Sequence, residues 1–594
     1  MNVLEEIQSR LKAALTGYAD DVDGPSSLVK PTQDPKHGDY QINSAMSLGK
    51  QLGKKPRDVA QEIVTRFDCG DMFHPPEIAG PGFINLRLQE TWLANQLQKM
   101  AADENLGVSP TSTPKTYVID FSSVNVAKPL HVGHLRSTII GDSLTRLLRF
   151  LGHKVVTDNH LGDWGTQFGM ILHGYKNFLD KDAFEKQPVE ELARIYKKVK
   201  DTIKEESTIK EGDEETAVSP TAEAARSETA KLHHGDEENT KLWKSFLPLS
   251  MAEVNEIYRR LDVYFDHFLG ESFYNPMLPG VVQDLLDKKI AEESEGAIAI
   301  FFGENEPPAL VRKSDGAFTY ATTDLATIKY RIENFAPDEI LYVVGSPQEL
   351  HFNQVFESAR RWGFDRVKYL HIKFGSILGA NRKKFSTSEG TGDKLELLLD
   401  EAVSHSAEKY QELLKERMKR GEDVPKFSEE ELRTLYDIIG IGAVKYADLS
   451  QNRVSDYKYD LSKMTATDGN TSTYMQYAYV RNRGIFRKEN IDPQPYRSNP
   501  PKVELATPEE KALGVALIRF EEALTAAAAD YQPSGITSYL WDVAKSYSKF
   551  FQECPVLKAD TPELKESRLL LCDLTGRVIQ KGLELLGIRT VERM

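Results

Sequence analysis

Two histidines stand three residues apart in the run His131-Val132-Gly133-His134, and they are the side chains best suited to chemistry. The run follows a strand-like segment and a loop, and it opens a stretch with apolar residues at helical spacing. Two imidazoles at this spacing share one helix face, the glycine lets a ligand approach closely, and the helix N-terminus attracts anions. This combination suits a triphosphate. The alternative is two ordinary histidines, but with 13 His and 39 Gly in the chain a random H-x-G-H should occur only about 0.02 times.

A second set of cations lies much later in the chain, where Lys383 and Lys384 precede a loop of Ser, Thr and Gly. Mobile ammonium groups on such a loop can neutralise phosphates during group transfer. Paired lysines on a polar loop are more often part of a solvated surface. Their presence in the same chain as the histidine run favours the phosphate role.

Strand-like runs alternate with helical stretches between residue 116 and about residue 400. The runs are TYVIDF, HKVVTDN, AIAIFF, EILYVVG and YLHIKFG. This alternation is typical of parallel βαβ units. It predicts an α/β, Rossmann-like domain with a parallel sheet, in which the histidine run follows the first strand.

Two further domains are predicted on either side of the α/β domain, which we place at 115–400. Residues 1–110 combine helical patterns with an alternating strand, which predicts a small α+β N-terminal domain, and the polar link GVSPTSTPK follows it. Long amphipathic stretches at 401–594 predict an all-α helical bundle. One of them opens with Thr507-Pro508-Glu509-Glu510, which has the spacing of a capping box.

One segment inside the α/β domain differs in composition from its surroundings. Residues 201–240 carry many acidic side chains and almost no large apolar ones. Such a segment cannot bury enough apolar surface to offset the entropy that it would lose on ordering. We therefore predict a mobile acidic insertion there.

The whole chain has 594 residues, with 75 Lys plus Arg against 90 Asp plus Glu, which gives a formal charge of −15. A uniformly basic nucleic-acid-binding surface is therefore excluded. The 3 cysteines are far apart with no C-x-x-C spacing, which excludes a zinc knuckle and predicts a reducing, cytoplasmic location. Glu5 and Glu6 stand where a secretory signal needs positive charge, and no long uninterrupted apolar run occurs, so we expect no membrane partner.

The histidine and lysine segments resemble the HIGH and KMSKS signatures of class I aminoacyl-tRNA synthetases, and the wider sequence resembles the arginyl-tRNA synthetase family over nearly its whole length. The resemblance is carried by FSSVNVAKPLHVGHLRSTIIG at 121–141, LGDWGTQFG at 161–169, GAVKYADLSQNR at 442–453, GNTSTYMQYAYVR at 469–481 and LLGIRTVERM at 585–594. Two departures occur: Val124 stands where the family often has proline, and Thr387 stands where the usual second catalytic lysine would be. Lys383 and Lys384 are the candidates to supply that charge.

The resemblance implies an arginine–tRNA ligase, in which the arginine carboxylate attacks the α-phosphorus of ATP, pyrophosphate leaves, and arginine passes to the 3′-terminal ribose of its cognate tRNA. Both steps need positioning and stabilisation of negative charge rather than a protein nucleophile. The expected catalytic residues are His131, His134, Lys383 and Lys384. The expected ATP-binding residues are Lys128, His131, Gly133, His134, Lys384 and Ser386. Mg²⁺ would arrive with ATP, held by substrate phosphates, and we expect no metal bound by the protein itself.

Selection of arginine needs a carboxylate and further acceptors, because a guanidinium group has five donors and no acceptor. The resemblance implies these arginine-binding residues: Asp120, Ser122, Asn125, Tyr320, Asp324 and Gln348. Structural alternatives exist, because Asp324 could cap a helix, Tyr320 could belong to the core and Asn125 could shape a turn. The run Asp163-Trp164-Gly165 is expected to support the pocket rather than to contact the substrate.

A tRNA partner must be bound by local basic and aromatic surfaces, because tRNA is a polyanion and the chain is acidic overall. In the family, the helical domain binds the anticodon and the N-terminal domain touches the tRNA elbow. The expected tRNA-binding residues are Tyr474, Tyr477, Arg481, Tyr547, Phe551 and Met594. Tyr474 and Tyr477 can share one helix face, as can Tyr547 and Phe551. Aromatic pairs at this spacing are more often core, and that alternative stays open.

The resemblance also implies a cytoplasmic monomer whose partners are arginine, ATP and the tRNA for arginine. Two alternatives remain. A class I synthetase for another amino acid would keep the ATP elements but would not need the set Asp120, Asp324 and Gln348. A non-catalytic tRNA-binding paralogue would keep the histidines only as structure; the missing second lysine favours it, and the intact histidine run disfavours it.

Overall fold

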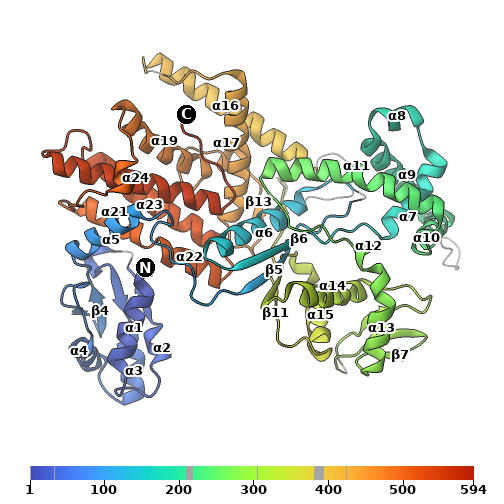
Figure 1. Cartoon of the computed structure of the whole chain (residues 1–594), viewed down its shortest axis with the longest axis horizontal. Coiled ribbons are helices and arrows are strands. Elements are labelled where there is room, and N and C mark those ends of the chain that lie inside the picture. The colour runs from blue at the N-terminus through green and yellow to red at the C-terminus, as the bar shows by residue number, and fades with distance from the viewer. Residues whose placement is uncertain are drawn as a thin grey trace. The chain divides into compact units, whose positions relative to one another are not determined.

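The structure is a computed structural model that describes residues 2–32, 34–126, 128–208, 219–303, 305–379, 394–422 and 424–594. The chain forms two compact units (Figure 1). One unit, which we call the sheet unit, comprises residues 112–413 and 451–463. The other, which we call the helical unit, comprises residues 1–111, 414–450 and 464–594. The predicted boundary at 400/401 falls inside one continuous helix, α16 (Leu395–Lys419), and the units divide at 413 instead.

The sheet unit contains the longer strands and the helices between them. Its elements are β5 (Thr116–Asp120), α6 (Val132–Phe150), β6 (Lys154–Asp158), α7 (Thr166–Phe178), α8 (Lys181–Lys186), α9 (Pro188–Thr208), α10 (Pro220–His233), α11 (Glu237–Leu261), α12 (Glu271–Tyr274), η2 (Asn275–Met277), α13 (Leu278–Asp287), β7 (Glu292–Ser294), β8 (Ala297–Ile300), β9 (Ala309–Arg312), α14 (Tyr320–Phe335), β10 (Glu339–Tyr342), η3 (Ser346–Gln348), α15 (Glu349–Arg361), β11 (Lys368–His371), β12 (Ile377–Leu378) and β13 (Tyr457–Lys458).

A four-stranded parallel sheet, in the order β11-β10-β5-β6, organises this unit. The register places Asp120 of β5 opposite Asp158 of β6 on one side and Tyr342 of β10 on the other. The carboxyl ends of the strands therefore meet at one edge, where parallel sheets commonly bind ligands. Helix α6 packs on β5 and β6, and α14 and α15 contact β5 and β11. The predicted α/β class with a parallel sheet is confirmed.

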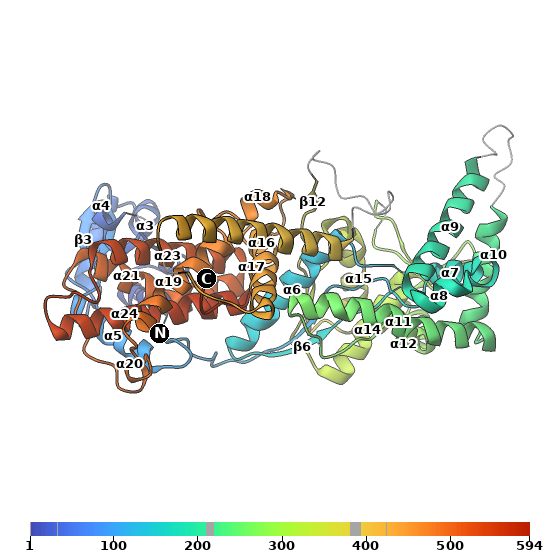
Figure 2. The same cartoon turned by 90° about the horizontal axis from the view of Figure 1, so that it is seen from above.

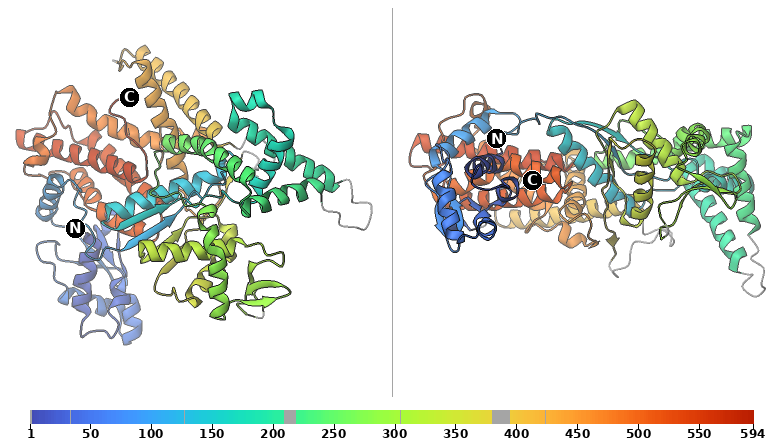
Figure 3. Two further views of the ribbon diagram at one scale, coloured as in Figure 1. Left: turned by 45° about the vertical axis from the view of Figure 1, so that its right-hand side comes forward. Right: turned by 90° about the horizontal axis from the view of Figure 1, so that it is seen from below.

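The predicted run AIAIFF forms a strand, but its assignment to the parallel sheet is wrong. It forms β8 of a separate antiparallel sheet in the order β7-β8-β9, seen in yellow-green in the left view of Figure 3. Glu295 and Gly296 link β7 to β8, and both have a positive φ. Such a two-residue link is typical of a tight hairpin, which pairs neighbouring strands antiparallel and leaves no room for a crossover helix.

The predicted mobile insertion at 201–240 is wrong for the residues that the structure describes. Residues 201–208 complete α9, and residues 219–240 form α10 and the beginning of α11. Residues 209–218 lie outside the described part of the chain. Figure 2 shows α9 and α10 side by side.

Two glycines of α7 explain how helices with few large apolar residues pack. A Cβ atom on Gly169 would lie 1.9 Å from Oγ1 of Thr229 in α10, and one on Gly174 would lie 2.1 Å from Cγ2 of Ile195 in α9. Because these positions carry no side chain, α9 and α10 approach the α7 backbone closely. Composition alone does not reveal this close approach, which adds to the burial of apolar side chains such as Ile195 and Leu232.

The helical unit combines the N-terminal region with most of the C-terminal helices. Its elements are α1 (Val3–Leu15), α2 (Asp23–Ser26), β1 (Val29–Pro31), η1 (Pro35–His37), β2 (Tyr40–Ile42), α3 (Ser44–Leu52), α4 (Pro56–Arg66), β3 (Glu77–Ala79), β4 (Phe83–Leu86), α5 (Glu90–Ala102), α17 (Glu429–Leu449), α19 (Ser472–Lys488), α20 (Pro495–Ser498), α21 (Pro508–Ile518), α22 (Phe520–Ala529), α23 (Ser534–Glu553) and α24 (Pro562–Leu585). The short helix α18 (Leu461–Met464) lies at the division between the units.

The predicted α+β N-terminal region and helical C-terminal region are confirmed. Strands β1-β2-β4-β3 form an antiparallel sheet, and the helices after α16 pack around a buried apolar core. The predicted capping box is present at α21, where the Thr507 side chain accepts from Glu510 N–H and the Glu510 side chain accepts from Thr507 N–H. Among the described helices, none is long and apolar enough to cross a membrane.

Candidate active site

The two histidines lie at the beginning of α6 and cap it. His131 is the N-cap residue, and its Nδ1 accepts a hydrogen bond of 3.1 Å from the N–H of Gly133. Nδ1 of His134 accepts a hydrogen bond of 3.1 Å from the N–H of His131, which completes a capping box. The two rings stack with their centroids 3.8 Å apart. The pair therefore satisfies N–H groups that have no partner inside the helix.

The hydrogen bonds determine which ring nitrogens carry protons. Because each Nδ1 accepts a hydrogen bond, the proton of each neutral ring must lie on Nε2. Burial, together with the neighbouring His131 and Lys128, lowers the pKa of His134 to about 3. His134 is thus neutral at physiological pH, and it offers an Nε2–H donor rather than a positive charge to an anion at this helix end.

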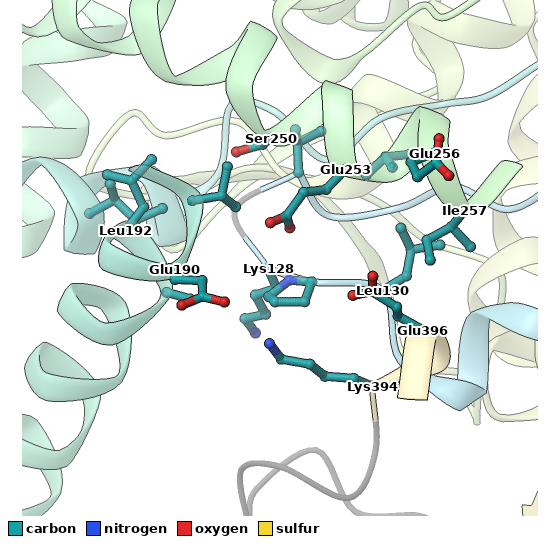
Figure 4. Close-up of a pocket in the computed structure, with 16 residues that line it drawn as sticks. Lys128, Leu130, Glu190, Leu192, Ser250, Glu253, Glu256, Ile257, Lys394 and Glu396 are labelled. Atoms are coloured by element: carbon teal, nitrogen blue, oxygen red, sulfur yellow. The ribbon is translucent and has the colours of Figure 1, made fainter. Parts of the chain in front are cut away.

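Lys128 and Lys394 line a pocket of about 140 Å³, which we call the lysine pocket. Figure 4 shows their ammonium ends pointing toward one another. Within the described residues, no ion pair joins either lysine to a carboxylate. Glu190 of α9 and Glu253 of α11 line the same pocket. Burial raises the pKa of the Glu253 carboxyl, and the nearby Lys394 opposes that shift.

Backbone pairing brings Lys394 to the histidine loop. The N–H of Leu395 donates a hydrogen bond of 3.0 Å to the carbonyl of Leu130, and Lys394 forms an antiparallel bridge with His131. Sequence reasoning missed Lys394, because an isolated lysine before a helix carries no distinctive signal. The predicted residues Lys383, Lys384 and Ser386 lie outside the described part of the chain.

A second pocket of about 350 Å³ lies at the carboxyl ends of β5 and β10, and we call it the acidic pocket. It contains five of the six predicted arginine-binding residues: Asp120, Asn125, Tyr320, Asp324 and Gln348. They come from the end of β5 and the loop after it, from the first turns of α14 and from η3. The parallel sheet and α14 thus gather side chains that are far apart in the sequence.

A buried ion cluster holds one wall of the acidic pocket. Nη2 of Arg331, on α14, lies 2.7 Å from Oδ2 of Asp120 and 2.8 Å from Oδ2 of Asp158. All three side chains are buried. Ser123 donates a hydrogen bond of 2.7 Å to the other carboxylate oxygen, Oδ1 of Asp120. Asp120 is therefore fixed in place from both sides.

Two further titratable pairs shape the electrostatics of the acidic pocket. Nε2 of His351 lies 2.5 Å from Oδ2 of Asp324. Burial lowers the pKa of His351, but the hydrogen bond and charge of Asp324 outweigh it, so that the net shift is upward. Burial, reinforced by the charges of Asp163 and Asp324, raises the pKa of Glu271 to about 7. The pocket thus combines the carboxyl groups of Asp120 and Asp324 with that of Glu271, whose pKa lies near neutrality, an arrangement that suits a cationic ligand.

Family models match three successive parts of the chain. The model described as "tRNA synthetases class I (R), catalytic domain" matches residues 96–461, which is more than half of the sequence. The chain belongs to the arginyl-tRNA synthetase family. The "Arginyl tRNA synthetase N terminal domain" model matches residues 5–88, and the "DALR anticodon binding domain" model matches residues 475–594.

Individual relatives of this arginyl-tRNA synthetase match along its full length. Arginine–tRNA ligase of Rhodopirellula baltica is 42% identical over 677 residues, which covers 100% of both chains. That of Trichodesmium erythraeum is 41% identical over 604 residues, again with 100% of both chains covered. The crystal structure of arginyl-tRNA synthetase from Plasmodium falciparum superimposes with a TM-score of 0.82 at 26% identity, covering 100% of this chain and 99% of that one.

One predicted arginine-binding residue of the synthetase points elsewhere. Oγ of Ser122 lies 2.7 Å from the hydroxyl oxygens of both Thr138 and Tyr258, and the residue does not line the acidic pocket. The prediction for Ser122 is therefore wrong in this structure. Ser122 and Ser123 both have positive φ values, 72° and 46°, and this turn presents Ser123 to the pocket instead.

Several residues of the acidic pocket were missed from the sequence. They are Ser123, His160, Gln167, Glu271, Thr323 and His351. Gln167 belongs to the quoted run LGDWGTQFG, and Thr323 adjoins Asp324 in the sequence, so proximity to known motifs could have indicated these two. His351 stands three residues after the predicted Gln348, so the same segment could have indicated it. Glu271 comes from a segment without a motif, and only the fold brings it in.

The predicted tRNA-binding residues of the synthetase differ in exposure. Arg481 is exposed, and its guanidinium lies over the ring of Phe551, 5.8 Å from the centroid, with Phe551 36% exposed. Tyr474 and Tyr477 are partly buried. Tyr547, at 1% exposure, belongs to the core, so its side chain offers no platform for a base in this structure. The side chain of Met594 is likewise buried, at 5% exposure.

Among the described residues, no group of three or more His, Cys, Asp or Glu side chains could hold a metal ion.

Proposed function

We propose that this arginine–tRNA ligase binds arginine in the acidic pocket and the phosphates of ATP between the histidine pair and the lysine pocket. The observation that carries the proposal is the gathering of Asp120, Asn125, Tyr320, Asp324 and Gln348 in one pocket. The resemblance in sequence indicates the same residues without reference to any contact between them. A chance set from separate segments would not converge at the sheet edge where parallel sheets bind ligands.

The guanidinium of the substrate meets Asp324 as its principal carboxylate. Asp120 already accepts hydrogen bonds from Arg331 and Ser123, so it contributes charge and a fixed wall. His351 engages only Oδ2 of Asp324 and leaves Oδ1 open for a guanidinium N–H. Glu271 adds a further negative charge when it is ionised. Gln348 and Asn125 supply polar groups for the α-amino group and the carboxylate.

The phosphates of ATP lie against the N-terminus of α6. His131 and His134 donate Nε2–H hydrogen bonds to phosphate oxygens as charge develops on them. When the arginine carboxylate oxygen bonds to the α-phosphorus, the bond to the bridging oxygen breaks and pyrophosphate leaves with the added charge. Lys128 and Lys394 stabilise that charge, because an anion between two converging ammonium groups relieves their mutual repulsion. Lys394 thus joins Lys383 and Lys384 as a candidate for the cation that Thr387 does not supply.

Further parts of the proposal concern partners. Mg²⁺ accompanies ATP and is held by its phosphates. We propose that residues 1–110 contact the tRNA elbow and that the C-terminal helices bind the anticodon, with Arg481 and Phe551 as an exposed cation–aromatic platform. We further propose that the enzyme works as a cytoplasmic monomer without a membrane partner.

The test is ATP-dependent charging of total tRNA with each of the twenty amino acids in turn. Two results together support the pocket assignment: the parent enzyme charges tRNA with arginine, and Asp324→Asn raises the KM for arginine. Lys394→Ala should slow arginine-dependent pyrophosphate exchange about 10²-fold with tRNA present, whereas Lys409→Ala, at an exposed position of the same helix α16, should change it little. Normal exchange in Lys394→Ala, or a charging defect in Asp324→Asn that leaves KM unchanged, would contradict the respective role.

A further inference from the structure

One wall of the acidic pocket is a short loop, residues 161–165, which we call the wall loop. Its Gly162 lines the pocket beside Asn125. The N–H of Gly162 donates a hydrogen bond of 2.9 Å to the carbonyl of Val124, and the carbonyl of Gly162 accepts one of 3.2 Å from Val126. The wall loop is thus paired with the segment that carries Asn125, so a shift of one displaces the other.

The far side of the wall loop is held by helices α10 and α11. Nε1 of Trp243, on α11, donates a hydrogen bond of 2.8 Å to the carbonyl of Asp163. Nε2 of His233, on α10, lies 2.8 Å from the carbonyl of Trp164. Because a carbonyl can only accept, His233 donates this hydrogen bond. Two consecutive carbonyls of the wall loop are therefore bound by side chains from two different helices.

Ring contacts of Trp164 with His233 and Trp243 also hold the wall loop. The Trp164 ring stacks on His233 at a centroid distance of 5.3 Å and an interplanar angle of 8°, and it meets the edge of Trp243 at 5.0 Å and 84°. The indole N–H of Trp164 is buried and has no hydrogen-bond partner within the described part of the chain. The position of this ring is therefore set by His233 and Trp243 rather than by a hydrogen bond of its own.

The insertion also reaches the pocket by a second route. Helix α10 packs against the backbone of α7 at Gly169, and Gln167, in the first turn of α7, lines the acidic pocket. Helix α10, which takes part in both routes, lies within the segment whose composition predicted a mobile insertion. Neither His233 nor Trp243 lines the pocket itself.

We propose that His233 and Trp243 are positioning residues that hold the wall loop and thereby adjust the binding of arginine. The inference rests on the proposed assignment of arginine to the acidic pocket. The contacts of His233 and Trp243 fix the position of the wall loop, and the wall loop in turn positions the substrate. A misplacement of substrate by about 1 Å can lower the rate about 10²-fold. The role of the helical insertion is thus to support the amino-acid site, and loss of these contacts should affect arginine more than ATP.

The test uses the full-length enzyme and separates the hydrogen bond from the ring contact. His233→Phe keeps an aromatic ring but loses the donor, and His233→Gln keeps an N–H donor but loses the ring. Trp243→Phe removes only the Nε1 donor and part of the ring. The matched control is His234→Phe, because His234 is the next residue, is exposed, and bonds only to Ala230 of its own helix.

Steady-state charging should give a KM for arginine about 5- to 10-fold higher in His233→Phe and Trp243→Phe. The KM for ATP and the melting temperature should stay near those of the parent enzyme, His233→Gln should recover part of the loss, and His234→Phe should behave like the parent. Unchanged KM values, or a parallel rise of both KM values with a lower melting temperature, would overturn the inference. If His233→Phe does not fold, Trp243→Phe decides alone.

A further variant tells failure of this inference from failure of the proposed function. If Asp324→Asn raises the KM for arginine while His233→Phe and Trp243→Phe leave it unchanged, the pocket assignment stands and the positioning role is overturned. If Asp324→Asn leaves the KM for arginine unchanged, the acidic pocket is not the arginine site, and the inference that depends on it is overturned as well.

Discussion

The guanidinium of Arg331 lies 2.7 Å from the carboxylate of Asp120, and both side chains are buried at one wall of the acidic pocket. An enzyme that selects a guanidinium substrate thus contains a guanidinium of its own against a pocket carboxylate. This internal pair is extended by Asp158, and Asp324, which contacts His351 through Oδ2, is the carboxylate that we propose for the substrate.

Arg331→Met should lower the free energy of unfolding by about 3–5 kcal/mol, because it leaves two buried carboxylates without their counter-charge. Chemical denaturation checks this. The double variant Arg331→Met/Asp158→Asn should recover part of the loss, since one uncompensated charge is then gone. Equal stability of the single variant and the parent would show that the cluster is better hydrated than the structure indicates.

Arginine binding should depend on pH through Glu271. Its pKa of about 7 means that it is neutral below pH 7 and charged above it, so the pocket gains negative charge as the pH rises. The KM for arginine should therefore fall about 3- to 10-fold between pH 6 and pH 8. Glu271→Gln should flatten that part of the profile, and a profile that keeps its shape in this variant would assign the titration to another group.

His134→Ala should slow arginine activation about 10²- to 10³-fold with little loss of tRNA affinity, because a donor to the developing phosphate charge is removed. Pyrophosphate exchange with tRNA present measures the rate. His134→Gln should retain more activity, since its amide can still donate. Because the pKa of His134 is about 3, the parent rate should show no titration of this residue between pH 6 and pH 9. A parent-like rate in His134→Ala would remove this residue from catalysis.

Phe551 and Tyr547 should respond differently to truncation, although they lie four residues apart on α23. Phe551→Ala should weaken tRNA binding about 5- to 100-fold at constant salt, because an exposed stacking surface is lost. Tyr547→Ala should instead destabilise the protein by about 3–5 kcal/mol, because its ring is buried. Filter binding and thermal unfolding separate the two effects. A Phe551→Ala protein with normal tRNA affinity would identify its ring as packing.

Gly169→Ala should destabilise the sheet unit by about 1–3 kcal/mol, because the added methyl group would overlap Thr229 and the carbonyl of Ala225. Gly280→Ala is the matched control, since Gly280 also lies in a helix and a Cβ there meets nothing within 4 Å. The control should be neutral or slightly stabilising. Equal melting temperatures for both variants would contradict the close packing of α7 against α10.

The sequence by itself determined the class of reaction and the order of the elements that carry it. The run from His131 to His134 follows an apolar strand and begins a helix, and the capping box at Thr507 begins another; both depend on residues within one or two turns of each other. The candidate residues Asp120, Asn125, Tyr320, Asp324 and Gln348 could be named because each stands in a recognisable local run, and the structure places them all in the acidic pocket.

Only the tertiary structure decided which neighbours enter a site, because such contacts join segments far apart in the sequence. The turn at Ser122 and Ser123 directs the Ser122 hydroxyl into the interior and the Ser123 hydroxyl toward Asp120 in the pocket. The sequence does not show which of the two serines faces the pocket. Lys394 meets Lys128 through backbone pairing with the histidine loop. Helices α9 and α10 pack closely against α7 because Gly169 and Gly174 carry no side chain. The sequence cannot indicate this role of the two glycines, because it depends on which helices lie next to α7.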